Sequence, residues 1–250
     1  MQDHTIPSGL HVAMILDGNG RWAQSQGQRR LYGHHKGAKA LKNVVLACPD
    51  LGVRYLTVYA FSSENWKRPK EEVSGLMSLM EQYLEEEIQA LADQGVCLKV
   101  IGNRQRLAPS LQKLILKAEA LTEGNGRLGL QVALSYGGRE DIVKATQKLA
   151  MCVQNQTMRP EDITETHITQ VLWTYPWPDP DLLIRLGGEQ RLSNFLLWQL
   201  SYSEFVFLPR YFPDFTVQDF REALMAYSQR QRKFGALPSD TSESASMASA

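Results

Sequence analysis

The sequence predicts a single α/β domain built around a largely parallel sheet. Short apolar, β-branched runs alternate with longer segments of helical periodicity along the chain. Its 250 residues are enough to bury one sizeable core of this class. No repeat or linker interrupts positions 1–237, which are therefore expected to fold as one domain. The remaining positions, 238–250, are small and polar with nothing to bury, so a disordered tail is expected there.

The expected elements follow the change of period along the chain. Apolar runs predict strands at 11–16, 54–60, 97–101, 129–134, 181–185 and 204–208. Helical spacing predicts helices at about 36–48, 72–94, 109–123, 139–154, 164–173 and 216–233. Ligand sites of parallel sheets lie beyond the carboxyl ends of the strands. The polar residues at or just after such ends, Asp17, Ser62 and Arg185, are therefore candidate site residues.

The helix expected at 72–94 has one apolar face and one acidic face. Its hydrophobic residues recur at helical spacing, which favours a helix that packs on the core. The alternative is a helix that forms the wall of an apolar channel. Periodicity alone does not separate these two interpretations.

The balance of charge and the sparse cysteines limit what the protein can bind and where it works. Basic and acidic residues both number 27, so no global field attracts nucleic acid. Three cysteines without a paired motif indicate reduced thiols in a cytosolic protein. The first residues lack the pattern of a signal peptide, and no apolar run is long enough to span a membrane. We therefore expect a cytoplasmic protein without a nucleic-acid partner.

The stretch DGNGRWA, after the first expected strand, combines a carboxylate and a cation across a glycine-rich turn. Glycines let the backbone come close to a ligand, and Arg21 adds a positive charge, which together suit a phosphate. Asp17 would repel that phosphate unless a divalent cation lay between them. Mg²⁺ accepts one carboxylate together with phosphate oxygens and water, so the stretch fits a Mg²⁺-bridged phosphate or diphosphate site. An ordinary turn, for which Asp-Gly and Asn-Gly are typical, is the equal alternative.

Two more polar stretches could contribute to such a site. GQRRLYGHHKG, at 27–37, is basic, and most of its charges are expected on a solvated face before a helix, with two or three at most facing a ligand. FSSENWKRPKEE, at 61–72, follows the second expected strand. Its short polar groups suit either a capped loop or a ligand site, and Trp66 beside two cations is unusual for a surface turn.

The stretch DLLIRLGGEQRLSNFLLWQLSYSEF, at 181–205, predicts a second anion site. A strand ends at Arg185, two glycines follow, and Arg191 and Ser193 then offer further donors. Arginine matches phosphate oxygens with two parallel hydrogen bonds. An aromatic-rich, helix-like segment leads to Glu204, which on pattern alone is better interpreted as a surface acid than as a second metal ligand.

These stretches together resemble the cis-prenyltransferases. The resemblance rests on HVAMILDGNGRWA, FSSENWKRP and IRLGGEQRLSNFLLWQLSYSEF, whose order and separation also fit, and it extends from about residue 10 to 235. It implies a parallel sheet flanked by helices with an apolar tunnel. It also implies repeated, Mg²⁺-dependent addition of isopentenyl diphosphate, with cis double bonds, to an allylic diphosphate such as farnesyl diphosphate. The product that the resemblance implies is a long-chain polyprenyl diphosphate, undecaprenyl diphosphate, which is the precursor of the lipid carrier for cell-wall glycan synthesis.

The matched positions imply roles for individual residues. Asp17 and Glu204 match Mg²⁺ positions, and Asp17 and Asn65 match catalytic positions. Substrate-binding positions are matched by Gly18, Asn19, Gly20, Arg21, Trp22, Arg30, His34, Ser62, Ser63, Glu64, Trp66, Arg68, Arg185, Arg191, Leu192 and Ser193. The family assigns proton removal to the position of Asn65. Because an amide has little basicity near neutral pH, we expect Asn65 to orient a group while the diphosphate or a water takes the proton.

The resemblance further implies a homodimer, and the lipid nature of substrate and product makes peripheral contact with the inner face of the cell membrane an expectation. Small Ala38 and Ala60 near the substrate end of the tunnel, with bulkier residues further along, would limit product length. The alternative is a non-catalytic partner subunit of a cis-prenyltransferase complex. That alternative is opposed by the presence of Asp17, Asn65, Arg68 and Arg185.

Overall fold

The computed structural model describes residues 6–230. The tail expected at 238–250, and the last residues of the helix expected at 216–233, lie outside this range. Six parallel strands form one sheet in the order β3-β4-β2-β1-β5-β6. Their bounds are β1 Leu10–Ile15, β2 Val53–Ser62, β3 Val96–Ile101, β4 Leu128–Tyr136, β5 Leu182–Arg185 and β6 Glu204–Phe207. The predicted strands and the parallel sheet are confirmed, with each strand end within two residues of its expected position.

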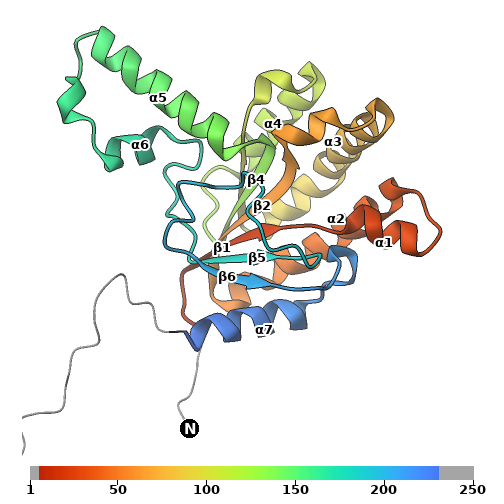
Figure 1. The fold of residues 1–250 in the computed structure, drawn as a ribbon. Helices are drawn as coiled ribbons and strands as arrows, with labels where there is room; N and C mark the ends of the chain where they lie inside the picture. Colours follow the sequence, from red (N-terminus) through yellow and green to blue (C-terminus); the bar gives the residue numbers. More distant parts are fainter. Residues whose placement is uncertain (1–5, 231–250) are drawn as a thin grey trace, which may run out of the picture.

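Helices flank this sheet, as Figure 1 shows. They are α1 Asn19–Ser25, α2 Arg30–Ala47, α3 Lys70–Asp93, α4 Pro109–Thr122, α5 Gly138–Gln154, α6 Glu165–Val171 and α7 Val217–Ser228. Side chains of β1 alternate between the two faces of the sheet. Val12 and Met14 join a large apolar cluster with α2, α3, α4 and α7, whereas Ala13 and Ile15 join a smaller cluster with Phe195.

Two local predictions are wrong. Helix α2 begins at Arg30, six residues earlier than expected, so most of GQRRLYGHHKG is helical, and the short α1 precedes it. Glycine usually weakens a helix, which obscured the pattern. Here Gly33 and Gly37 instead let α1 approach α2, because a Cβ on Gly33 would lie 1.9 Å from the carbonyl oxygen of Asn19.

The segment between β5 and β6 is the second correction. Residues 194–203, expected to be helix-like, form a series of turns. Ser193, Asn194 and Leu196 all have positive φ, at 50°, 64° and 43°, which no right-handed helix allows. Phe195, Leu196 and Leu200 are nevertheless buried in the smaller apolar cluster, whereas Tyr202 is exposed.

His11 forms part of a buried polar chain on the face of the smaller cluster. Its Nδ1 lies 2.6 Å from the carbonyl oxygen of Pro178, and its Nε2 lies 2.8 Å from Oγ1 of Thr57. A carbonyl oxygen only accepts, so Nδ1 carries a proton and donates it to Pro178. Burial lowers the pKa of His11 to about 4, despite opposing contributions from Pro178 and Asp181. The imidazole is therefore neutral in the folded protein.

We expect this histidine to make the protein less stable in mild acid. Below pH 6.5 His11 of the unfolded chain binds a proton, whereas His11 of the folded protein binds one only below about pH 4. The free energy of unfolding therefore decreases as the pH is lowered from 6.5 to about 4. In a His11→Gln variant this difference of one bound proton is absent. The free energy of unfolding should then change with pH by roughly 1.4 kcal/mol per pH unit less than in the wild type. Denaturant unfolding between pH 4 and 7 measures this slope, with His35→Gln at an exposed position as control. An unchanged slope in His11→Gln would contradict the expectation.

Among residues 6–230, no helix is both long enough and apolar enough to cross a membrane.

Candidate active site

A cavity of about 900 Å³ opens at the carboxyl edge of the sheet and continues between the sheet and α2 and α3. Polar residues from the segments after β1, β2 and β5 line one part of it. Apolar residues line the rest, among them Ala38, Leu41, Val45, Ala60, Leu76, Met77, Leu79, Met80, Leu84, Leu91, Leu98, Val100, Leu130, Val132 and Leu134. Helix α3 is thus both a core helix and a cavity wall, because Leu84 and Leu91 belong to the buried cluster as well. The two interpretations of its apolar face are both correct.

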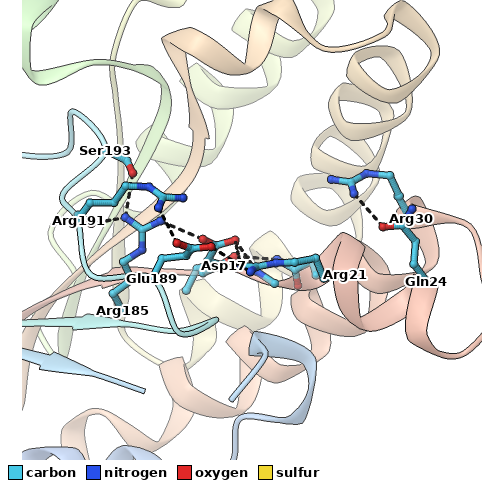
Figure 2. A network of polar contacts seen from close by, with 11 residues as sticks. Asp17, Arg21, Gln24, Arg30, Arg185, Glu189, Arg191 and Ser193 are labelled. Carbon is cyan, nitrogen blue, oxygen red and sulfur yellow. Dashed lines mark hydrogen bonds and ion pairs between the residues drawn. The ribbon is translucent and has the colours of Figure 1, made fainter. Parts of the chain in front are cut away.

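Asp17, two residues beyond β1, lies between two arginines at the polar part of this cavity (Figure 2). Its Oδ2 is 3.0 Å from Nη2 of Arg185, and its Oδ1 is 3.2 Å from Nη2 of Arg21. The N–H of Gly18 also donates to Oδ1 at 2.6 Å. Burial alone would raise the pKa of Asp17, but the hydrogen bonds from Arg185 and Gly18 and the charge of Arg21 outweigh it and hold that pKa below its ordinary value. The carboxylate is therefore charged at neutral pH.

The glycine turn after Asp17 has the geometry that its sequence favours. Gly18 adopts φ 94°, a left-handed conformation open to glycine, and a Cβ there would lie 2.4 Å from the ring of Tyr211. Gly20 packs on the guanidinium of Arg30, where a Cβ would lie 2.6 Å from Cζ. The backbone of 18–20 is thereby brought to the cavity wall without an intervening side chain.

A first cation cluster lies at the N-terminal end of α2. It consists of Arg21, Arg30 and Arg68, and these three line the cavity together with His34. Glu72 holds two of them, at 3.3 Å from Arg30 and 3.0 Å from Arg68. Burial and the neighbouring charge of Arg68 lower the pKa of His34 to about 4, so His34 is neutral and does not add to the charge of the cluster.

A second cation cluster follows β5 and is built on Arg185, whose side chain is only 3% exposed. Nη1 of Arg185 donates to Oγ of Ser193 at 2.8 Å and to the carbonyl oxygen of Arg191. The left-handed glycines 187 and 188, with φ of 84° and 77°, turn the chain so that Glu189 reaches back. Its carboxylate contacts Arg21 at 3.1 Å and Arg191 at 2.5 Å, which joins the two clusters, as Figure 2 shows.

Ser62 and Asn65 hold the turn after β2 by reciprocal hydrogen bonds. Oγ of Ser62 accepts from the N–H of Asn65 at 3.2 Å, and Oδ1 of Asn65 accepts from the N–H of Ser62 at 3.1 Å. This capping arrangement begins the short helix η2 Ser63–Lys67. Both residues also line the cavity, so capping and a place at the site, treated as alternatives above, occur together.

Most of the predicted site residues come together around this cavity. Its lining includes Asp17, Gly18, Asn19, Gly20, Arg21, Arg30, His34, Ser62, Glu64, Asn65, Arg68, Arg185, Arg191 and Ser193. Trp22, Ser63, Trp66 and Leu192 are not in the lining. Trp66 instead donates from Nε1 to Oγ of Ser135 at 2.9 Å and packs edge-on against Phe61.

Glu204 is not brought near Asp17 within one chain. It begins β6 and pairs in register with Leu182, which is level with Val12 of β1. That places Glu204 five residues before Asp17 along the strand direction, roughly 16 Å at about 3.3 Å per residue. Its Oε2 forms an ion pair with Arg230 at 2.8 Å.

Buried polar atoms without partners gather at the predicted site. Within residues 6–230, the buried side-chain atoms that find no hydrogen-bond partner are Oδ1 of Asn19, Nε1 of Trp22, Nε2 of His34 and Nε of Arg185. Buried polar groups are normally hydrogen-bonded, and a buried donor or acceptor without a hydrogen bond costs about 1–3 kcal/mol of stability. Asn19, His34 and Arg185 line the cavity, so their unpartnered atoms indicate a site built for a polar ligand, whereas Trp22 is not in the lining.

Sequence patterns missed several residues of the site. Glu189 bridges the two clusters, Tyr59 and Asn194 line the cavity, and Tyr211 packs on Gly18 with the guanidinium of Arg21 5.3 Å from its ring centre. Glu189 follows a double glycine beside a predicted arginine, which was an available signal. For Tyr211, twenty-six residues beyond Arg185, the sequence offered none.

Asp17 has the properties of the single carboxylate ligand of a magnesium ion. It is charged, it lines the cavity, and it lies among cations that would hold phosphate oxygens. No group of three or more His, Cys, Asp or Glu side chains in the described part of the chain could form a metal site of protein ligands alone. Mg²⁺ is often bound by one or two carboxylates together with substrate phosphates and water, so this donor set matches it.

The fold and site define a class of protein: a parallel α/β sheet whose carboxyl edge joins two cation clusters to an apolar cavity, suited to a ligand with an anionic head and a hydrocarbon chain. Comparison with known proteins identifies the family. Residues 15–235 match the family model described as "Putative undecaprenyl diphosphate synthase". The chain belongs to this prenyltransferase family.

Individual relatives agree with that assignment. The chain is 47% identical to an isoprenyl transferase of Agrobacterium fabrum over 91% of its length and 92% of the relative's. It is also 47% identical to a ditrans,polycis-undecaprenyl-diphosphate synthase, farnesyl-diphosphate specific, of Escherichia coli over 90% and 89%. A lavandulyl diphosphate synthase of Lavandula x intermedia, solved with dimethylallyl diphosphate, superposes with a TM-score of 0.89 at 42% identity, covering 93% of this chain and 100% of that one. A probable undecaprenyl diphosphate synthase of Campylobacter jejuni gives 0.76 at 32% identity, covering 90% and 97%.

Proposed function

We propose that the protein condenses isopentenyl diphosphate repeatedly with an allylic diphosphate, farnesyl diphosphate being the expected starter, to make undecaprenyl diphosphate. The observation that carries this proposal is the pair of cation clusters joined by Asp17 and Glu189 at the mouth of an apolar cavity. Two clusters can take two diphosphates, and the cavity can take a growing chain. The relatives named as undecaprenyl diphosphate synthases support the same activity.

The first cluster suits the departing diphosphate. Breaking an allylic C–O bond leaves extra negative charge on the diphosphate and cation character on the allyl group. Arg21, Arg30 and Arg68 supply positive charge that stabilises this separation. Bound Mg²⁺, held by Asp17, would supply Lewis acidity toward the phosphate oxygens. The Mg²⁺ role of Glu204 stays a prediction.

The second cluster suits the diphosphate of isopentenyl diphosphate. Arg185, Arg191 and the hydroxyl of Ser193 offer hydrogen-bond donors to its oxygens. The buried side chain of Arg185 holds Ser193 by a hydrogen bond, which fixes the orientation of these donors. Holding the second double bond near the allylic carbon supplies proximity. Asn65, fixed by Ser62, lies at the cavity wall where it can orient the group that loses the proton. This arrangement favours an enzyme over a non-catalytic partner subunit.

Incorporation of labelled isopentenyl diphosphate onto farnesyl diphosphate tests the proposal. We expect long-chain products with Mg²⁺, loss of incorporation with a chelator, and recovery when Mg²⁺ is added back in excess. Sizing the products by chromatography gives the chain length. Well-folded protein that incorporates nothing with several allylic starters would refute the proposal and favour the partner-subunit alternative.

The Ala60→Leu variant should make shorter products. Ala60 lines the cavity, so the larger side chain takes up volume that the growing chain would otherwise occupy. Product length from the same assay measures the effect. The control is Ala90→Leu, an equal change on the exposed side of α3. Equal product lengths in the wild type and Ala60→Leu would show that this wall does not limit chain growth.

Assembly and location belong to the same proposal. We infer a cytoplasmic homodimer, as the family resemblance implies. We also infer peripheral contact at the inner face of the cell membrane, because the proposed product is a membrane lipid that would serve cell-wall glycan synthesis. Sedimentation analysis tests the dimer, and flotation with vesicles tests the membrane contact. A monomer at micromolar concentration, or no flotation with the product present, would contradict the respective part.

A further inference from the structure

Asn194 lies in the segment that carries the second cation cluster, directly after Ser193, and lines the cavity. Its backbone is left-handed, with φ of 64°. Asparagine adopts this conformation more readily than other residues apart from glycine. The carbonyl oxygen of Asn194 accepts from the N–H of Gly138 at 2.7 Å, which anchors the segment to the first residue of α5.

The side-chain amide of Asn194 uses both of its ends. Oδ1 accepts from the N–H of Arg139 at 2.9 Å, and Nδ2 donates to Oε1 of Glu64 at 2.7 Å. Burial raises the pKa of Glu64, but hydrogen bonds to the carboxylate, with that from Asn194 the largest, outweigh it and lower the pKa. The contact to Glu64 is therefore charge-assisted and stronger than one between neutral groups.

These contacts join two parts of the site that are 130 residues apart in sequence. On one side, Ser193 accepts from Arg185 at 2.8 Å and its carbonyl oxygen accepts from Tyr59 at 3.4 Å. On the other side, Glu64 belongs to η2, one residue before Asn65. The fit around the amide is close, because a Cβ on Gly137 would lie 2.8 Å from Nδ2 of Asn194.

We propose that Asn194 is a positioning residue that fixes the isopentenyl diphosphate site, formed by Arg185, Arg191 and Ser193, relative to the turn that carries Asn65. The inference rests on the proposed function, from which it takes the identity of that substrate. Only an amide meets both demands here. A carboxylate would keep the bond from Arg139 but oppose Glu64, and alanine would lose both contacts.

Four variants, with Glu64→Gln alone as the reference for the double variant, separate the side-chain contacts from the backbone conformation. Asn194→Gly keeps the left-handed φ and removes the amide, so it remains informative where Asn194→Ala fails to fold. Asn194→Asp sets two carboxylates against each other. Glu64→Gln combined with Asn194→Asp restores a donor and an acceptor with their positions exchanged. The control is Asn125→Ala, which removes a structural amide bound to the carbonyl oxygens of Ala92 and Val96, away from the cavity.

Steady-state kinetics with each substrate varied gives the decisive readout. Loss of these solvent-accessible hydrogen bonds should raise the KM for isopentenyl diphosphate by about tenfold in Asn194→Gly and Asn194→Asp. The KM for farnesyl diphosphate should stay within about twofold of wild type. The double variant should return the KM for isopentenyl diphosphate to within about threefold of Glu64→Gln alone. Asn125→Ala should lower the melting temperature and leave both KM values within about twofold.

Other outcomes would overturn the proposal. Equal rises in both KM values, or a lower melting temperature with both KM values unchanged, would leave Asn194 a structural residue only. Calorimetric binding of isopentenyl diphosphate separates this proposal from the proposed function. Wild-type protein that binds this ligand without turnover, with a Kd raised by Asn194→Gly, would contradict the function and support the positioning role. Active wild type with an unchanged Kd in Asn194→Gly would contradict the positioning role, and wild type that neither binds nor reacts would contradict both.

Discussion

Replacing Asp17 with asparagine should reduce the rate of isopentenyl diphosphate incorporation by about a thousandfold. The substitution keeps the shape of the side chain and removes its charge. Mg²⁺ would lose its protein carboxylate, and the charge stabilisation that one such group supplies at a transition state is worth roughly 3–4 kcal/mol, or a factor of about 10²–10³.

A second consequence of Asp17→Asn is structural. Arg185 is almost completely buried and its Nη2 is paired with Asp17 at 3.0 Å, so the variant leaves a buried cation without its partner. We therefore expect a lower melting temperature together with the loss of activity. Asp50→Asn, at an acid whose side chain is 78% exposed, is the control and should change neither. Folded Asp17→Asn that keeps more than a tenth of wild-type activity would contradict the assigned role.

The Gly33→Ala variant should be both less stable and much less active. Glycine to alanine inside a helix usually adds about 0.5–1 kcal/mol of stability. Here the new methyl group would lie 1.9 Å from the carbonyl oxygen of Asn19, which is backbone and cannot rotate away. Either α1 or α2 must shift, at a cost of about 1–3 kcal/mol.

Activity should fall because that shift moves the glycine turn and Arg21 away from their places at the cavity. A displacement of about 1 Å at a reacting site can cost roughly a hundredfold in rate. Thermal unfolding and the incorporation assay measure the two effects. Gly75→Ala in α3 is the matched control, since its methyl group would meet only the mobile end of Leu31 at 3.1 Å. Wild-type activity in Gly33→Ala would show that α1 and α2 can separate without consequence for the site.

The central strands were predictable because β1, β4 and β5 are buried on both faces along almost their whole length. Parallel strands under helices are continuous apolar runs, so their pattern is distinct from that of the helices around them. The residues closing those runs, Asp17 and Arg185, could be assigned to one edge of the sheet before any contact was known. Their contact at 3.0 Å confirms that reasoning.

The rest depended on contacts between distant segments. The glycines of α2 resemble helix breakers until Asn19 is placed against them. Asn194 resembles any surface asparagine until its left-handed backbone and its partners Gly138 and Glu64 are known. Glu204 shows the opposite case, in which a family motif predicts a role while the single chain places the residue at the other end of the strands.

The chain of contacts from Arg191 through Glu189, Arg21 and Asp17 to Arg185 alternates in sign. Each cation near the mouth of the cavity thus already has an internal counter-ion. An arriving diphosphate does not meet bare positive charge and competes with a carboxylate for part of each guanidinium, although Nε of Arg185 has no partner of its own. Binding becomes an exchange of one anion for another, which weakens the response to added salt and favours ligands whose charge density exceeds that of a carboxylate. A monophosphate is then a poorer competitor than a diphosphate at equal concentration.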